Sequence, residues 1–260
     1  MSTVKKALGL LEYFSSGTPE IGLSEFKDLT KFDKGTVYRY LTSLCECGFL
    51  EQNLSTKAYR LGPAVIRLAA VREITVPLVN LVAPFMEQLA SDTHELVHAA
   101  IPQRNAMSTL YVVDGGHSGT RVGFDRAELL PFHATSSGIA MLAFGPQKLL
   151  KTTLAKGLKK FTNETSISTQ AVDALIIKAR AAGYAFANQS FEDEVCSVAV
   201  PFFGPSEFAI GTIAIATPAS RMSDDMRERS VAQLTEVSTQ LTVDLGGKVP
   251  ANVSNIWSQL

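Results

Sequence analysis

The residues best suited to bind a small molecule form a short run of hydroxyl side chains, Thr135, Ser136 and Ser137. The run stands at the start of an apolar stretch, residues 137–144, that favours a helix. The first N–H groups of a helix lack intrahelical acceptors and carry the positive end of the helix dipole. Together with the hydroxyl groups they can bind an anionic or carbonyl group. Capping of the helix by Thr135 or Ser136 accounts for the same residues equally well.

Hydrolysis is the catalytic chemistry that this region could support. Ser136 or Ser137 would be the nucleophile, His133 the base, and Asp193 the acid that orients the base. The sequence contains no GxSxG nucleophile elbow. We therefore favour a packed, hydrogen-bonded role for His133 and predict that the chain is not an enzyme.

The cysteines and histidines do not have the spacing of metal ligands. The chain has 3 cysteines, an odd number without a CxxC pair, and its 4 histidines are scattered. These residues are Cys45, Cys47, Cys196, His94, His98, His117 and His133. We predict no metal site, no disulfide and no cofactor. Cys196 has two possible roles, as a small residue of the hydrophobic core or as a residue lining a ligand pocket.

A second set of polar residues lies on a helix predicted to begin after the capping residue Asp33 and to end at Gly48. Its apolar stripe is Val37, Leu41 and Leu44. The residues facing away from this stripe carry hydrogen-bonding groups and little negative charge. They are Lys34, Thr36, Tyr38, Arg39, Thr42 and Ser43. Such side chains suit the base edges and phosphates of a DNA major groove, although an ordinary solvated helix face has the same composition.

The elements around this helix fit a winged helix-turn-helix. Two helices are predicted before it, over residues 4–14 and 24–29, and two short strands after it, over 48–51 and 58–61. Ser24 is the expected cap of the second helix, and Leu29 is one of its inward residues. Lys27 departs from the small apolar residue usual in such motifs, and its side chain can point outward. Lys57, in the turn of the wing, is a further candidate for contact with DNA.

The rest of the chain predicts a larger α+β domain. Strand-like runs cover residues 95–101, 107–113, 195–203 and 208–217, and helices are indicated at 137–144, 169–182 and 224–245. Strand hairpins mixed with helices predict a mainly antiparallel sheet. A helical stretch from Thr75 contains Pro84, which either kinks it or opens a second segment. We divide the chain into a winged helix-turn-helix over 1–62, a linker helix over 63–74 and a binding and oligomerisation domain over 75–250.

Charge and hydropathy agree with this division. Residues 1–72 hold 10 basic and 7 acidic side chains, a balance of +3, and residues 73–260 hold 14 basic and 18 acidic ones, a balance of -4. The sign suits a nucleic-acid module at the N-terminus. No apolar run approaches the roughly 18 residues that cross a bilayer, and no signal peptide is indicated. We expect a cytoplasmic protein without membrane contact.

Three blocks of the sequence resemble the IclR family of bacterial regulators. Residues 33–50, followed by 59–62, are similar to that family's recognition helix and wing. Residues 130–143 are similar to its effector-domain signature, and 183–186 with 195–201 match a third block. The resemblance implies a GAF-like sensor fold after the winged helix-turn-helix. It also implies that the loop of hydroxyl residues holds the polar end of an effector.

The resemblance places Cys196, Ala214 and Ala216 beside that loop in the pocket. Ala214 and Ala216 alternate along one strand and so share a face, which gives an apolar wall. The apolar linker helix indicates pairing with a second copy, and the resemblance supports a homodimer, with a tetramer possible.

The resemblance and the residue pattern together predict a transcription regulator that binds double-stranded operator DNA. A small carboxylate or carbonyl effector is expected to control this binding, and the regulated genes are expected to form a catabolic operon. The alternatives are a hydrolase-like enzyme with an appended DNA-binding domain, and a structural DNA binder whose C-terminal domain only oligomerises.

Overall fold

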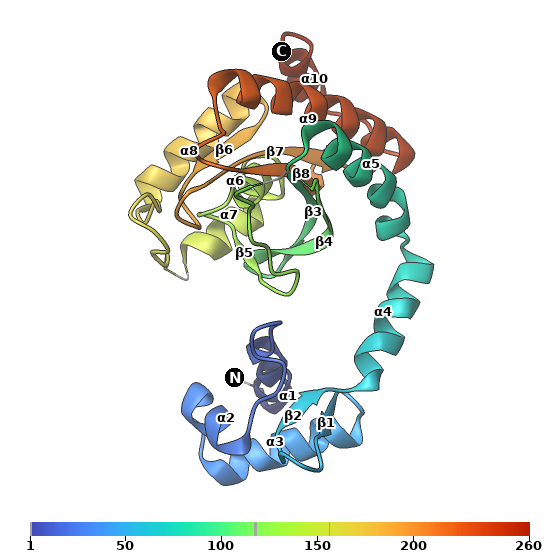
Figure 1. The fold of residues 1–260 in the computed structure, drawn as a ribbon, viewed down its shortest axis with the longest axis vertical. Coiled ribbons are helices and arrows are strands. Elements are labelled where there is room, and N and C mark those ends of the chain that lie inside the picture. Colours follow the sequence, from blue (N-terminus) through green and yellow to red (C-terminus); the bar gives the residue numbers. More distant parts are fainter. Residues whose placement is uncertain (1, 117–118, 156) are drawn as a thin grey trace. The chain divides into compact units, whose positions relative to one another are not determined.

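The computed structural model describes residues 2–116, 119–155 and 157–260. The chain forms two compact units, Met1–Pro77 and Leu78–Leu260, which are described separately. Figure 1 shows the helices and strands of each unit. In the part of the chain that is described, no helix is both long and apolar enough to cross a membrane.

The first unit is a small helical domain with a two-stranded hairpin. Its elements are α1 (Thr3–Leu8), a 3-10 turn (Gly9–Tyr13), α2 (Leu23–Thr30), α3 (Lys34–Glu46), β1 (Leu50–Gln52), β2 (Tyr59–Leu61) and α4 (Pro63–Thr75). Leu10, Phe26, Leu41 and Leu50 are fully buried in its core. The predicted order of helix, short helix, longer helix and wing is confirmed.

Two details of the first unit differ from the sequence prediction. The first helix does not run unbroken to residue 14, because it tightens into a 3-10 turn at Gly9, a residue of poor helix propensity. The second helix begins at Leu23 and not after Ser24, because the Glu25 carboxylate accepts the Gly22 N–H at 2.6 Å. Leu29 is exposed rather than inward.

The second unit is built on a six-stranded antiparallel sheet in the order β5-β4-β3-β8-β7-β6. Its strands are β3 (Leu96–Gln103), β4 (Ala106–Asp114), β5 (Leu130–Pro131), β6 (Ala185–Asn188), β7 (Val195–Phe203) and β8 (Ala209–Pro218). Its helices are α5 (Leu78–Thr93), α6 (Ser136–Phe144), α7 (Gln147–Leu154), α8 (Thr169–Ala182), α9 (Asp224–Asp244) and α10 (Ala251–Trp257). The predicted α+β class with an antiparallel sheet is confirmed.

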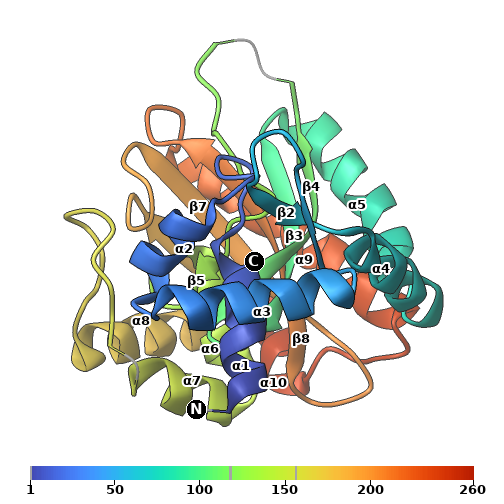
Figure 2. The same ribbon diagram turned by 90° about the horizontal axis from the view of Figure 1, so that it is seen from below.

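Helices cover both faces of this sheet. On one face Val97, Val198 and Ile215 pack with α5 and α9, which lie side by side in Figure 1. Pro84 lies inside one continuous α5, so it does not open a second segment. Figure 2 shows α7 and α8 together at one end of the unit, away from α5. Successive side chains of each strand point to opposite faces of the sheet, and helices bury both of these faces.

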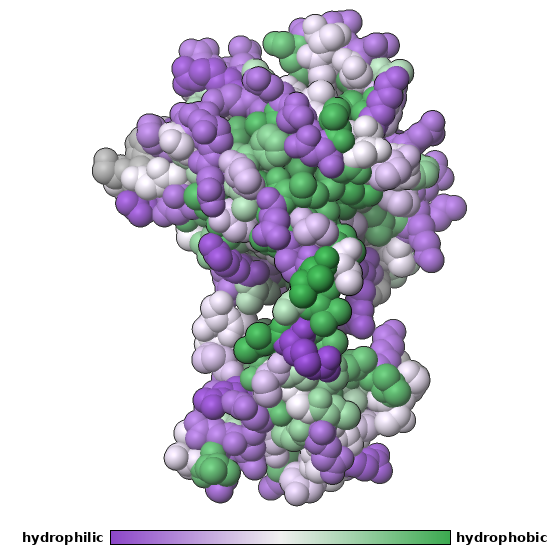
Figure 3. Space-filling view, turned by 90° about the vertical axis from the view of Figure 1, so that its right-hand side faces the viewer, coloured by the Kyte–Doolittle hydropathy of each residue, from purple (hydrophilic) through white to green (hydrophobic). Residues whose placement is uncertain are grey.

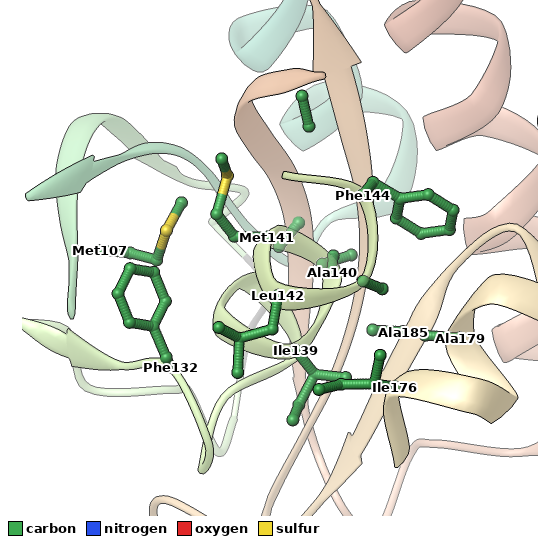
Figure 4. Close-up of a cluster of buried hydrophobic side chains, with 14 of the residues drawn as sticks. Met107, Phe132, Ile139, Ala140, Met141, Leu142, Phe144, Ile176, Ala179 and Ala185 are labelled. Carbon is green, nitrogen blue, oxygen red and sulfur yellow. The ribbon is translucent and has the colours of Figure 1, made fainter. Parts of the chain in front are cut away.

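The other face of the sheet is covered by α6, which is apolar around its whole circumference. All nine of its residues are buried, as expected for a helix without a solvent face. Figure 4 shows Ile139 and Leu142 of α6 among Phe132 and Ile176. Gly138 is required at the start of α6, because a Cβ there would overlap the backbone of Phe132. The start of α6 is thereby held close to the sheet.

The second unit continues beyond residue 250. Val253 of α10 is buried, and the Trp257 indole donates to the Gly183 carbonyl at 2.8 Å. Helix α10 packs on α8 through these contacts. The sequence boundary at residue 250 therefore left out a helix that belongs to this unit.

Candidate functional site

Helix α3 presents one buried and one polar face. Val37, Tyr40, Leu41 and Leu44 are buried, and Tyr40 extends the stripe expected from the sequence. Asp33 caps the helix, accepting the Thr36 N–H at 2.9 Å and the Thr36 hydroxyl at 2.7 Å. These hydrogen bonds lower the pKa of Asp33. The hydroxyl of Thr36 therefore stabilises the helix start as well as lying on the polar face.

The other predicted DNA-contacting residues of α3 are mostly open to solvent. Lys34, Tyr38, Arg39 and Ser43 are exposed, and Thr42 is half-buried. The Arg39 guanidinium lies 5.8 Å from the centre of the Tyr40 ring. This cation–π contact helps to hold the Arg39 side chain against the helix. This face combines two cations with hydroxyl groups, as phosphate and base contacts require.

The wing is held in place by Glu20, a residue that the sequence pattern did not single out. The Glu20 carboxylate accepts hydrogen bonds from Asn53 Nδ2 at 3.0 Å and from Thr56 Oγ1 at 3.1 Å. Arg60 adds a 2.6 Å ion pair to Glu51 across the hairpin. Lys57, the predicted contact residue of the wing, is exposed with a φ of 61°. No spacing rule marks Glu20, because its partners lie more than thirty positions later.

The second unit contains a cavity where α6 begins above the sheet. The cavity is partly enclosed and partly open to solvent. Its inner lining contains four buried polar residues, Thr135, Ser136, Ser137 and His98, together with the half-buried Ser197 and the apolar Ala216. Its side walls are apolar, with Val122, Phe124, Leu130, Ala134, Ala187, Phe191 and Val195. Its outer lining consists of Asp125, Glu128 and Glu192.

Hydrogen bonds fix the inner polar groups. Thr135 caps α6 by accepting the Gly138 N–H at 3.0 Å. Ser136 Oγ donates to Ser197 Oγ at 2.7 Å, and Ser137 Oγ lies 3.0 Å from His98 Nε2. The start of α6 is thus tied to both β7 and β3. Thr135 is therefore a cap and a lining residue at once.

His98 is a site residue that the sequence analysis did not identify. It is 5% exposed, and burial lowers its pKa to about 4, so the imidazole is neutral at pH 7. Its ring lies 5.2 Å from that of Phe124. Nδ1 is buried without a hydrogen-bond partner among the described residues. The sequence feature that could have identified His98 is its place as a polar residue within the apolar, strand-like run 95–101.

The Ser137 and His98 pair lacks the other requirements of a nucleophilic site. A base with a pKa near 4 takes up protons poorly at neutral pH, and no described residue orients the imidazole through Nδ1. His133, the base considered from the sequence, instead places Nε2 2.9 Å from the Lys159 carbonyl oxygen. Asp193 is exposed and is not part of the cavity lining.

Two residues predicted to line the pocket lie elsewhere. Cys196 precedes Ser197 on β7, so its side chain points to the opposite face, where Sγ contacts Asn188 Oδ1 at 3.1 Å. Burial raises the pKa of the Cys196 thiol. Ala214 shares a sheet face with Ala216 but is fully buried with α6 in the hydrophobic core. Of the predicted effector residues, the structure brings together Thr135, Ser136, Ser137 and Ala216.

The described residues hold no group of three or more His, Cys, Asp or Glu side chains that could bind a metal ion. His117 lies outside the described residues. The acidic outer lining is therefore not arranged as a metal centre.

A polar recognition helix with a wing and a separate, partly polar cavity define a class of protein, the DNA-binding regulators that carry a sensor domain. Comparison with known sequences agrees. A sequence model of the IclR helix-turn-helix domain matches residues 3–54, and one of the bacterial transcriptional regulator IclR C-terminal region matches residues 73–243. The chain belongs to the IclR family of bacterial transcription regulators.

Individual relatives span nearly the whole chain. The HTH-type transcriptional regulator KdgR of Escherichia coli K12 is 25% identical and covers 95% of this chain and 93% of its own. A solved structure from Silicibacter sp. TM1040, assigned to the IclR regulators, is 39% identical with a TM-score of 0.88 and covers 96% and 99% of the two chains. An IclR homologue from Microbacterium hydrocarbonoxydans is 23% identical with a TM-score of 0.75, covering 94% and 99%. The first two of these similar proteins are described as transcriptional regulators.

Proposed function

We propose that this regulator binds operator DNA through α3 and the wing, and that a small molecule in the cavity of the second unit controls that binding in the cytoplasm. The observation that carries the proposal is the partly polar cavity in a chain that also presents an exposed recognition helix. Regulation of a catabolic operon fits relatives such as the glycerol operon regulatory protein of Streptomyces coelicolor, 23% identical over 95% of this chain.

The DNA contacts are tested by replacing the two cations of α3. We expect Lys34→Ala with Arg39→Ala to weaken binding to the native promoter, because each removes a phosphate or base contact. The slope of log affinity against log salt should flatten by about one unit for each lost phosphate contact. Lys178→Ala, an exposed lysine of α8, is the control. Unchanged gel-shift affinity in the double variant would remove α3 from the interface.

For the effector we propose a small compound whose carboxylate or carbonyl group meets the Thr135–Ser137 turn. Hydroxyl groups and the positive end of α6 converge there, while apolar walls accommodate the rest of the molecule. The Microbacterium homologue was solved in complex with 4-hydroxybenzoate, a ring compound with such a group.

Calorimetry on lining variants tests this site. Ser136→Ala should weaken carboxylate ligands more than their ester analogues, and Ala216→Leu should block the cavity while leaving the fold intact. Ala214→Leu serves as the contrast, since it adds bulk under α6 and should reduce stability instead. Undiminished ligand binding in the Ala216→Leu variant would move the effector site elsewhere. A protein that binds no small molecule at all would fit a purely structural DNA binder.

We further propose that the protein acts as a homodimer formed through α4, with a tetramer as a possible larger assembly. Ile66, Leu68, Val71 and Ile74 of α4 are exposed, and Figure 3 shows hydrophobic residues gathered over this helix. Exposed apolar surface of this kind marks an interaction site. A dimer presents two recognition helices to the half-sites of a pseudo-palindromic operator.

A further inference from the structure

The outer lining of the cavity is acidic. Asp125 and Glu128 come from the segment between β4 and β5, and Glu192 comes from the segment between β6 and β7. Among the described residues that line the cavity, none is a lysine or an arginine. Two segments more than sixty positions apart therefore bring negative charge to the same opening.

The outer glutamates, Glu128 and Glu192, have no direct ion-pair partner among the described residues. Neither Glu128 nor Glu192 makes a side-chain hydrogen bond or ion pair with another described residue. Partial burial raises the pKa of both, and the charge of Glu128 raises the pKa of Glu192 further. The charge of Asp125 raises the pKa of Glu128, and the charge of Lys159 lowers it. The Lys159 ammonium itself lies over the Phe161 ring, 5.0 Å from the ring centre.

A second, independent feature points to a ligand at the inner end. His98 is buried, and its ring lines the cavity between Ser137 and Phe124. Its Nδ1 has no hydrogen-bond partner among the described residues, and a buried polar atom left unpaired is costly. A bound molecule that hydrogen-bonds to Nδ1 would remove that cost. The cavity is therefore polar and neutral inside, apolar along its walls and negative at its opening.

We propose that the effector carries a positively charged amine at its outer end, held between Glu128 and Glu192, and a carbonyl or carboxylate group at its inner end. This inference rests on the proposed effector site and specifies the class of its ligand as an amino acid or amino ketone with an apolar centre. A ligand whose only charge is negative gains nothing from the opening, and an ammonium group both satisfies the two glutamates and relieves their repulsion.

Two probes of nearly equal shape, one with a positive charge at the outer end and one without, test the contribution of that charge to binding. 4-(Aminomethyl)benzoate carries an ammonium group at pH 7, and 4-(hydroxymethyl)benzoate carries a neutral hydroxyl in its place. Calorimetry with the full-length protein should show about tenfold tighter binding of the amine. In Glu128→Gln with Glu192→Gln this preference should fall below about threefold, with the affinity of the alcohol unchanged. Asp193→Asn, a nearby exposed carboxylate outside the lining, is the matched control and should keep the full preference.

The outcomes distinguish this inference from the proposed function. Equal affinity of the two probes, or a preference that survives the double glutamine substitution, overturns the cationic end and leaves the effector site standing. Binding that is indifferent to Ala216→Leu shows that the probes lie outside the cavity and overturns the assignment. If neither probe binds a folded protein, the cavity does not take compounds of this class, and the proposed effector falls with the inference.

Discussion

At the scale of single residues, His98 makes the stability of the second unit sensitive to pH. Its folded pKa of about 4 lies below the ordinary histidine value of 6.5. The unfolded chain therefore takes up a proton that the folded chain refuses, and stability present above pH 6.5 is lost as the pH falls toward 4. The free energy of unfolding should drop by about 2 kcal/mol between pH 7 and pH 5 from this residue alone.

Chemical denaturation of the wild type and of His98→Gln at several pH values measures this effect. The variant should be less stable at pH 7, because the hydrogen bond to Ser137 is altered. Its stability should also fall less steeply between pH 7 and pH 5, because it has no imidazole to protonate at this position. Parallel curves for the two proteins would show that His98 does not control the acid response.

The sequence identified the cavity residues that are close together along the chain and missed those that the fold brings in. Thr135, Ser136 and Ser137 precede an apolar helix, and that local pattern is readable. Glu128 and Glu192 meet at one opening only because their two segments converge in space. Cys196 was misplaced by a single position, since side chains alternate across a strand and only Ser197 points into the cavity.

At the scale of elements, Arg221 ties the segment between β4 and β5 to the residue that precedes β3. Arg221 makes two 2.7 Å hydrogen bonds to the buried carboxylate of Glu95 and donates to the Thr120 carbonyl at 2.8 Å. Glu95 is 5% exposed, so loss of its partner leaves a buried charge unpaired. Arg221→Ala should therefore lower the free energy of unfolding by roughly 3 kcal/mol and loosen the segment that carries Phe124.

Denaturant titration of three variants separates charge from packing. Arg221→Ala should cost the most, and Arg221→Gln with Glu95→Gln should recover part of the loss, because the buried site no longer holds a charge. Arg227→Ala is a suitable control, since its partner Asp224 is well exposed. A double variant as unstable as Arg221→Ala would show that the guanidinium matters through packing rather than through charge.

Long elements with regular patterns were predictable, whereas several of the short ones were not. The range of α8 and that of β7 agree with the sequence prediction to the residue. The α7, β6 and α10 segments were missed because each is eight residues or shorter, too few to establish a periodicity. Their positions are fixed by tertiary contacts, as the Trp257 hydrogen bond to Gly183 illustrates.

At the scale of the whole molecule, the modest charge asymmetry between the two parts acquires a local meaning. The N-terminal excess includes Lys34 and Arg39 on the exposed face of α3 and Lys57 on the wing. Part of the C-terminal acidity lies at the opening of the cavity, in Asp125, Glu128 and Glu192. A count of charges gives the balance of each part, but only the fold shows which of these charges lie on α3, on the wing and around the cavity.

Assembly through α4 would bury two strongly exposed isoleucines. Ile66 is 75% exposed and Ile74 is 81% exposed, although both are large apolar residues. If a second copy covers them, Ile66→Glu with Ile74→Glu should place charges in the interface and dissociate the dimer, while each unit keeps its fold. Operator binding should weaken at the same time, because separate monomers no longer share two half-sites. Ile177→Glu, a well-exposed isoleucine of α8, controls for the added charge. Light scattering that reports the same mass for the α4 double variant and the wild type would exclude α4 as the dimer interface.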